Sequence, residues 1–236
     1  MPNLNVNIST VLVGLVYEDI SLTLRSILVQ PTIPKSIIIV CPKNLNYKIE
    51  ENFSKVKNLK IVNDKGEGVY FAMNMGLDVV TTKLVHYLNA GDEAFNDIYF
   101  NINKPGLLKV RIFDENKKFV ADAIPLIGNG SYNHQGVIFP ANHRKYDTKY
   151  LIAADFKLML FLFKRKLSIS QANNDAYVKY FLGGLSSKSN FQAKIEMIRI
   201  GFEYSLFYGL FVTLHIIANI LLGRFVRRFI LKMVSR

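Results

Sequence analysis

Short apolar runs alternate with amphipathic segments along the first part of the chain. Residues 9–16 and 36–41 are rich in branched aliphatic side chains, which is typical of strands buried on both faces. Between them, apolar residues recur at helical spacing within 20–30, and Pro31 and Pro34 are expected to end that helix. The strand–helix–strand order predicts a right-handed parallel crossover unit.

A third strand is expected at residues 58–62, and it leads into the most informative stretch of the chain. Residues 64–68 form a polar turn with two glycines, and a segment with helical periodicity follows. An apolar strand at 84–88 then ends abruptly in Asn-Ala-Gly-Asp. Ligands of α/β proteins collect beyond the carboxyl ends of strands, so this pattern predicts an α/β fold with a ligand site at these turns.

The second half of the chain gives weaker signals. Residues 107–113 alternate as a strand does, the polar residues 114–118 predict a turn, and residues 119–121 are expected to return as the hairpin partner. Apolar positions at Leu158, Met159 and Leu162 predict a helical run after Asp155, with this acid near the helix N-terminus.

Several motifs resemble those of the family 2 glycosyltransferases of bacterial surface-polysaccharide pathways, which have the GT-A fold. Their pattern is Asp, then Gly-x-Tyr-x-Ala-x-Asn-x-Gly, then a strand ending in Leu-Asn-Ser/Ala-Gly-Asp. Here it is formed by Asp64, Gly68, Tyr70, Ala72, Asn74, Gly76, Leu88, Asn89, Ala90, Gly91 and Asp92. Further matches are Thr-Leu-x-Ser-Ile-x-x-Gln at 23–30, the pair His134 and Gln135, Ala-Asp-Phe at 154–156, and Gly-Gly-x-Ser at 183–186.

The resemblance covers most of residues 9–190 and implies a GT-A-like domain over 1–190, with a mostly parallel sheet flanked by helices. It also implies an inverting transfer from a nucleotide-sugar donor to a lipid-linked saccharide acceptor in bacterial polysaccharide biosynthesis. The residues expected to bind the nucleotide sugar, or to shape its site and pack the helix, are Asp64, Gly68, Tyr70, Asn74, Asn89 and Gly91. Asp92 is expected to ligate Mg²⁺ or Mn²⁺, which bridges diphosphate oxygens.

Asp155 is the expected catalytic base, although an aspartate at this place could equally be a helix N-cap. His134 and Gln135 would line the acceptor site or contact the diphosphate, and a structural role for the histidine is the alternative. The remaining histidines, His86, His143 and His215, lack the spacing of metal ligands and receive no role.

The sequence departs from the family pattern in two places. The second strand ends in Val40-Cys41-Pro42 without the acid that helps the family to hold the nucleotide base, so base recognition must differ or depend on Asp64. The chain has no tryptophan, so the Gln-x-x-Arg-Trp signature of processive synthases is absent and addition of a single sugar is favoured.

Charge and hydropathy suggest a membrane surface as a partner. The 236 residues include 30 Lys and Arg against 18 Asp and Glu, a net charge of +12, which favours anionic partners; no nucleic-acid-binding motif is present, so nucleic acid is not expected. In a second segment, 191–236, a mostly apolar run at 202–222 is interrupted by Glu203, His215 and Asn219. This favours helices lying in the membrane interface, with a spanning helix or one packed on the protein as alternatives.

The single cysteine, Cys41, fits a reducing compartment, and the first residues lack the features of a signal peptide. We therefore expect a peripheral or monotopic protein on the cytoplasmic face of the inner (plasma) membrane. Two rival functions remain: a non-catalytic basic membrane-binding module, and a degenerate transferase-like scaffold.

Overall fold

A computed structural model of the chain describes residues 4–123, 132–162, 175–183, 190–218 and 220. The chain divides into two compact units, Met1–Gly184 and Leu185–Arg236, and each is described here by itself. The predicted Gly-Gly-x-Ser turn lies mostly outside the described residues, as do Asn219 and residues 221–236.

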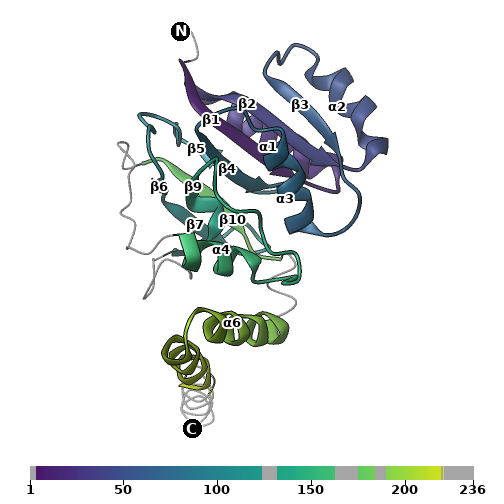
Figure 1. The fold of residues 1–236 in the computed structure, drawn as a ribbon. Helices are drawn as coiled ribbons and strands as arrows, with labels where there is room; N and C mark the ends of the chain where they lie inside the picture. The colour runs from purple at the N-terminus through teal and green to yellow at the C-terminus, as the bar shows by residue number, and fades with distance from the viewer. Residues whose placement is uncertain (1–3, 124–131, 163–174, 184–189, 219, 221–236) are drawn as a thin grey trace. The chain divides into compact units, whose positions relative to one another are not determined.

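The first unit is built on a six-stranded sheet with the order β3-β2-β1-β4-β9-β6 (Figure 1). Four strands are parallel: β1 (Leu4–Val13), β2 (Thr32–Cys41), β3 (Leu59–Asn63) and β4 (Leu84–Asn89). Two antiparallel strands, β9 (Val137–Pro140) and β6 (Gly106–Leu107), continue the sheet beyond β4. Residues 37–41 of β2 are fully buried, which explains their continuous apolar sequence.

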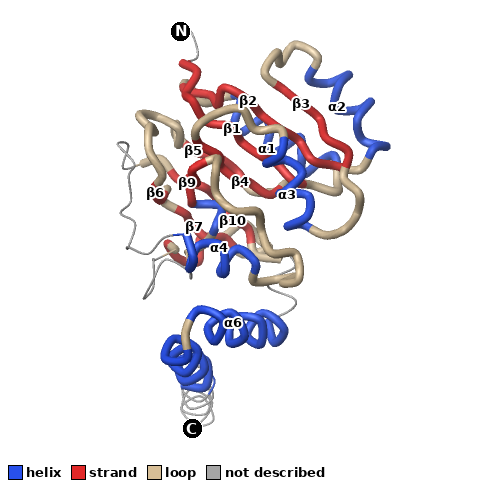
Figure 2. Tube along the Cα trace, in the orientation of Figure 1, coloured by secondary structure: helices blue, strands red, loops and turns tan. Residues whose placement is uncertain are grey.

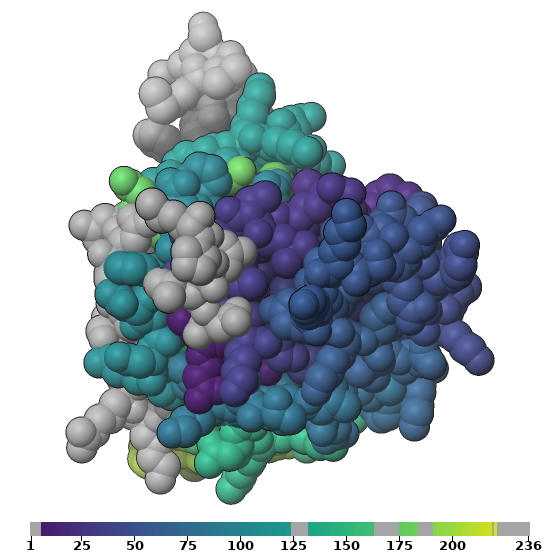
Figure 3. All heavy atoms as spheres, turned by 90° about the horizontal axis from the view of Figure 1, so that it is seen from above, coloured from purple at the N-terminus to yellow at the C-terminus, as the bar shows by residue number. Residues whose placement is uncertain are grey.

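Helices α1 (Tyr17–Leu28), α2 (Asn46–Phe53) and α3 (Val69–Asp78) connect the parallel strands (Figure 2). Helix α3 packs on β1 and β2. Gly76 makes this approach possible, because a Cβ at this position would lie 2.4 Å from Val11 Cγ1. In the space-filling view of Figure 3, the purple and blue atoms of these first elements form a continuous face.

A second sheet has the order β5-β10-β7-β8, with β5 (Glu93–Phe95), β10 (Tyr177–Phe181), β7 (Val110–Phe113) and β8 (Phe119–Asp122). The predicted hairpin is therefore confirmed as β7 and β8, which pair antiparallel. Short 3₁₀ turns are η1 (Lys43–Leu45) and η3 (His134–Gly136), and α4 (Ala154–Leu162) follows β9.

Some predicted element boundaries were wrong. The first strand ends at Val13 and not at residue 16, and α1 begins at Tyr17, so Leu15 and Val16 form an exposed connection. Pro34 does not follow the helix as a stop but lies within β2, opposite Val6, where a register shift in β1 accommodates it. Helix α2 had no prediction, since its eight residues are polar apart from buried Ile49 and Phe53 and exposed Tyr47.

The second unit contains α6 (Asn190–Tyr204) and a further helical stretch at 206–218. The two meet at glycines: a Cβ on Gly201 would lie 3.1 Å from the Cα of Gly209. Within the described residues, no helix is both long and apolar enough to cross a membrane.

Candidate active site

The candidate site lies at the carboxyl ends of the parallel strands. β1 is central, with β2 on one side and β4 on the other, so the connections after β1 and β4 leave the sheet at a topological switch point. Backbone hydrogen bonds from Gly14 N to Val40 O and from Ala90 N to Val13 O tie these strand ends together at 3.2 and 2.8 Å.

The turn before α3 presents backbone amides at the end of β3. Asp64 Oδ1 accepts a hydrogen bond from Gly66 N at 3.0 Å, and Gly66 and Gly68 have φ angles of 76° and 102°, a region that favours glycine. Among the described residues, no atom beyond its chain neighbours lies within 4 Å of a Cβ built on Gly68, and this glycine, the N-cap residue of α3, has no side chain to cap the helix. Uncapped amides at a helix N-terminus suit an anionic ligand.

Helix α1 holds the turn after β4 in place. Thr23 Oγ1 accepts from Gly91 N at 2.9 Å and donates to Asp92 O at 2.7 Å. Ser26 Oγ accepts from Ala94 N at 2.9 Å, and Gln30 accepts from Asp97 N. The polar residues of the Thr-Leu-x-Ser-Ile-x-x-Gln motif thus position the turn that carries Asp92, a role that the sequence did not indicate.

Asp92 is a buried acid, with 5% of its surface exposed. Its Oδ1 accepts from Phe181 N of β10 at 2.9 Å. Burial raises its pKa to about 8, while the bond from Phe181 and the nearby Gln135 amide act in the opposite direction. Among the described residues, no cationic side chain contributes to this balance.

A divalent cation fits the chemistry of Asp92, because it would compensate the charge that burial disfavours. No group of three or more His, Cys, Asp or Glu side chains that could hold a metal occurs in the part of the chain that the structure describes. Asp92 is the residue that would hold such an ion, and the ion would supply positive charge beside a diphosphate.

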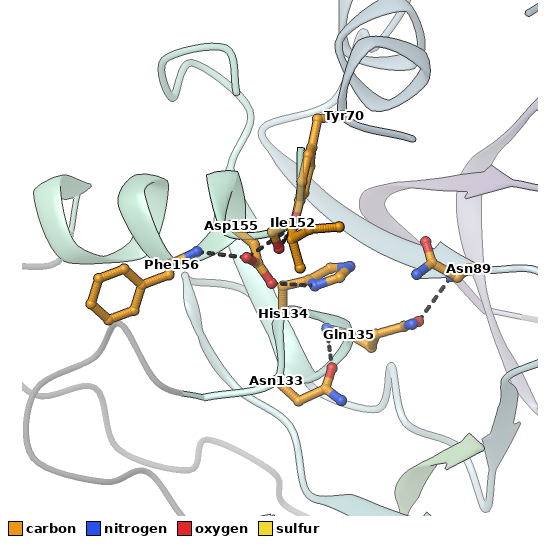
Figure 4. A network of polar contacts seen from close by, with 8 residues as sticks. All are labelled: Tyr70, Asn89, Asn133, His134, Gln135, Ile152, Asp155 and Phe156. Carbon is orange, nitrogen blue, oxygen red and sulfur yellow. Dashed lines mark hydrogen bonds and ion pairs between the residues drawn. The ribbon is translucent and has the colours of Figure 1, made fainter. Parts of the chain in front are cut away.

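Asp155 lies one residue inside α4, in its first turn, so it does not occupy the N-cap position. Its Oδ1 accepts from Phe156 N at 2.7 Å and from the Tyr70 hydroxyl at 3.0 Å, and its Oδ2 accepts from His134 Nδ1 at 2.9 Å (Figure 4). The side chains of Asp155 and His134 are 22% and 12% exposed. The structure thus brings together three predicted site residues that are far apart in the sequence.

Gln135 connects this cluster to the turn after β4. Its Oε1 accepts from Asn89 N at 2.8 Å (Figure 4). Its backbone oxygen accepts from His86 Nε2 at 2.7 Å. His86 Nδ1 in turn contacts the Tyr99 hydroxyl at 3.0 Å. His86 therefore holds the backbone of Gln135 in place. His86 received no role from the sequence, because its spacing bears only on metal binding and a bond to a backbone oxygen has no sequence pattern.

Buried polar atoms of this region without a hydrogen-bond partner among the described residues include Asn89 Oδ1, His134 Nε2 and Tyr146 Oη. Buried polar atoms are normally paired, so these atoms have capacity for a ligand or water. Asn74 differs, because both ends of its amide bond the backbone of Tyr146, at 2.9 and 2.8 Å. It packs α3, which is one of the two roles expected for it.

Comparisons with known proteins agree with this architecture. No protein-family model matches the chain, and no curated protein matches its sequence. Crystal structures of Staphylococcus aureus TarS are similar: one has a TM-score of 0.60 and 15% identity, covering 83% of this chain and 39% of TarS. TarS 1–349 in complex with UDP has a TM-score of 0.58 and 16% identity, and its complex with UDP-GlcNAc 0.57 and 14%.

Each of these two complexes covers 83% of this chain, which in turn spans 65% and 66% of theirs. The chain therefore spans less than two thirds of the structures it matches. At these identities the likeness concerns the fold, and it confirms the predicted GT-A-like α/β architecture with a mostly parallel sheet flanked by helices.

Proposed function

We propose that this chain is a glycosyltransferase that moves a sugar from a nucleotide-sugar donor to a saccharide acceptor with inversion at the anomeric carbon. The observation that carries the proposal is the hydrogen bond between Asn89 N and Gln135 Oε1. It joins the turn with Asp92 to the segment with His134, and through His134 to Asp155. A turn suited to a diphosphate and a carboxylate suited to accept a proton thus belong to one network (Figure 4).

The donor would lie over the carboxyl ends of β3 and β4. Asp64 and Gly68 would contact it at the uncapped N-terminus of α3, and Asn89 and Gly91 would shape the turn below the diphosphate. TarS, which shares the fold, has been crystallised with UDP and UDP-GlcNAc, which supports testing UDP-sugars first. Mg²⁺ or Mn²⁺ held by Asp92 would supply positive charge to the leaving diphosphate.

In the proposed reaction, an acceptor hydroxyl oxygen bonds to the anomeric carbon as the bond from this carbon to the diphosphate oxygen breaks. The electron pair of that bond leaves with the nucleoside diphosphate, and the hydroxyl proton passes to Asp155. A single displacement of this kind inverts the configuration. The partial exposure of Asp155, 22% of its side chain, supports its access to an acceptor.

We propose further that the second unit binds the membrane surface where a lipid-linked acceptor would lie, as a peripheral or monotopic element on the cytoplasmic face. Its helical stretch at 206–218 exposes large apolar side chains along one helical face, namely Leu206, Phe207, Leu210, Phe211 and Leu214. Co-sedimentation with vesicles tests this: binding should require anionic lipid and weaken when Phe207 and Phe211 are changed to Asp. Equal sedimentation of this variant would refute it.

The function is tested by calorimetric titration of UDP, UDP-GlcNAc and other nucleoside diphosphates, with and without Mn²⁺, followed by transfer assays with lipid-linked saccharides. D155N should bind the nucleotide as the unchanged chain does and lose turnover about 100-fold or more. D147N is the matched control. Asp147 lies before α4 and pairs with Lys157, a residue of the helix that also carries Asp155, at 2.7 Å. Asp147 lies outside the network.

The rival functions predict other results. A non-catalytic membrane-binding module would bind vesicles and no nucleotide sugar, and D155N would change nothing. A degenerate scaffold would bind nucleotide without turnover. Either outcome would overturn the proposed activity.

A further inference from the structure

The Asp155 carboxylate is held on both oxygens by donors from different segments. Besides the adjacent Phe156 amide, these are the hydroxyl of Tyr70 on Oδ1 and the ring nitrogen Nδ1 of His134 on Oδ2. A carboxylate offers about four lone-pair sites. Three donors within the described residues therefore leave one site, on Oδ2, for an acceptor hydroxyl.

Tyr70 connects this acid to the segment before α4. It comes from the first turn of α3, 85 positions before Asp155, and 7% of its surface is exposed. Its ring packs against Tyr146 at a centroid distance of 5.2 Å, and its single hydroxyl proton is shared between Ile152 O at 2.7 Å and Asp155 Oδ1 at 3.0 Å. These contacts link α3 to α4 and account for the position of Tyr70 without contact with a nucleotide.

His134 is fixed from its own side. It begins η3, whose Asn133 side chain accepts a hydrogen bond from Gln135 N at 3.0 Å. An ionised Asp155 accepts only, so the ring proton must lie on Nδ1 and point to Oδ2. The ring is thereby oriented in one tautomer.

We infer that Tyr70 and His134 are positioning residues for acceptor activation, which together hold the Asp155 carboxylate in one orientation and leave a lone-pair site on Oδ2 for the acceptor hydroxyl. The inference rests on the proposed function. It is narrower than the roles expected from the sequence, in which Tyr70 bound the nucleotide sugar, shaped its site or packed the helix, and His134 lined the acceptor site, contacted the diphosphate or was structural. Because α3 begins directly after the turn expected to bind the donor, Tyr70 connects donor site and base.

The chain offers matched variants. Tyr70→Phe removes one hydroxyl and keeps the ring. Tyr87→Phe is its control, since Tyr87 is also buried and bonds His143 Nε2 at 2.8 Å, away from Asp155. His134→Leu removes the donor, whereas His134→Asn keeps an amide nitrogen the same number of bonds from the backbone as Nδ1.

The first readout is turnover. Y70F and H134L should each lower kcat roughly 10- to 100-fold, the effect of one hydrogen bond to a charged group, and leave the affinity for the nucleotide unchanged. H134N should recover part of the loss, and Y87F should match the unchanged chain. If Y70F instead weakens nucleotide binding and leaves kcat intact, Tyr70 is a donor contact and the inference is wrong.

The second readout needs no substrate. The ¹³C chemical shift of the Asp155 carboxyl at neutral pH, identified by its loss in D155N, should move in Y70F and H134L and stay unchanged in Y87F, because only the first two variants remove a hydrogen-bond donor to this carboxyl.

These readouts separate the two proposals. An unmoved Asp155 carboxyl signal in both variants overturns the inference whatever the activity. A moved signal without sugar transfer by the unchanged chain leaves the contacts supported and overturns the proposed function, together with the catalytic part of the inference.

Discussion

Replacing Asp92 by asparagine tests whether a buried acid limits the stability of the ligand-free protein. Burial raises the pKa of Asp92 to about 8, against an ordinary value of 3.8. The folded state therefore keeps the proton in a range where the unfolded chain has lost it. Stability is highest below the unfolded pKa and falls as pH rises toward the folded value.

The size of the effect follows from the shift. Each pH unit between the two pKa values lowers the free energy of unfolding by up to about 1.4 kcal/mol. From pH 5 to pH 8 the loss is therefore at most about 4 kcal/mol, and about 2 kcal/mol if the structure around Asp92 relaxes when the carboxyl ionises. The amide introduced by Asp92→Asn cannot ionise and can still accept the Phe181 N–H. The stability of this variant should therefore exceed that of the unchanged chain increasingly as pH rises.

The assay is urea unfolding followed by circular dichroism at pH 5, 6.5 and 8, for both chains, with and without Mn²⁺ and UDP. We expect the difference in unfolding free energy to grow by about 2–4 kcal/mol from pH 5 to pH 8. Mn²⁺ added together with UDP should stabilise the unchanged chain more than the variant at pH 8. Two parallel pH curves would refute the burial argument, and equal stabilisation of both chains by Mn²⁺ with UDP would refute Asp92 as the metal ligand.

Three further outcomes are expected. Burial lowers the pKa of His86 to about 4, so the contribution of neutral His86 to folding stability is present above pH 6.5 and is lost as pH falls to 4. In the same urea assay, His86→Gln should remove about 3 kcal/mol of this loss of stability in acid. Gly76→Ala should destabilise by about 1–3 kcal/mol, because the added methyl overlaps Val11, and an unchanged urea midpoint would contradict that packing. Thr23→Val should cost about 1–3 kcal/mol, because Asp92 O loses its donor and Gly91 N–H keeps only its longer bond to Asp19 O; it should also weaken nucleotide binding measured by calorimetry.

The sequence indicated much of the first unit because its signals are local. Apolar runs marked β2 and β4, helical spacing marked α1 and α3, and the polar turn at 114–118 predicted the β7–β8 hairpin. Element boundaries were less certain, since Pro34 lies within β2 where β1 has a register shift and β3 does not yet pair. No local pattern reports such an arrangement.

For the candidate site, the sequence identified residues but not their partners. Thr23, Ser26 and Gln30 were motif positions on a helix, and only the folded chain connects them to the turn at 91–97. Asn74 was expected near the nucleotide or in helix packing, and the structure has it bonding the backbone of Tyr146.

By itself, the amino-acid sequence determined the succession of strands and helices, the glycine turns at strand ends, and which acids stand next to them. Tertiary structure alone decided that Tyr70, His134 and Asp155 form one cluster and that Asp92 is buried. The physical reason is range. Periodicity and turn chemistry act over a few residues, whereas a hydrogen bond between positions 70 and 155 depends on how separate segments pack.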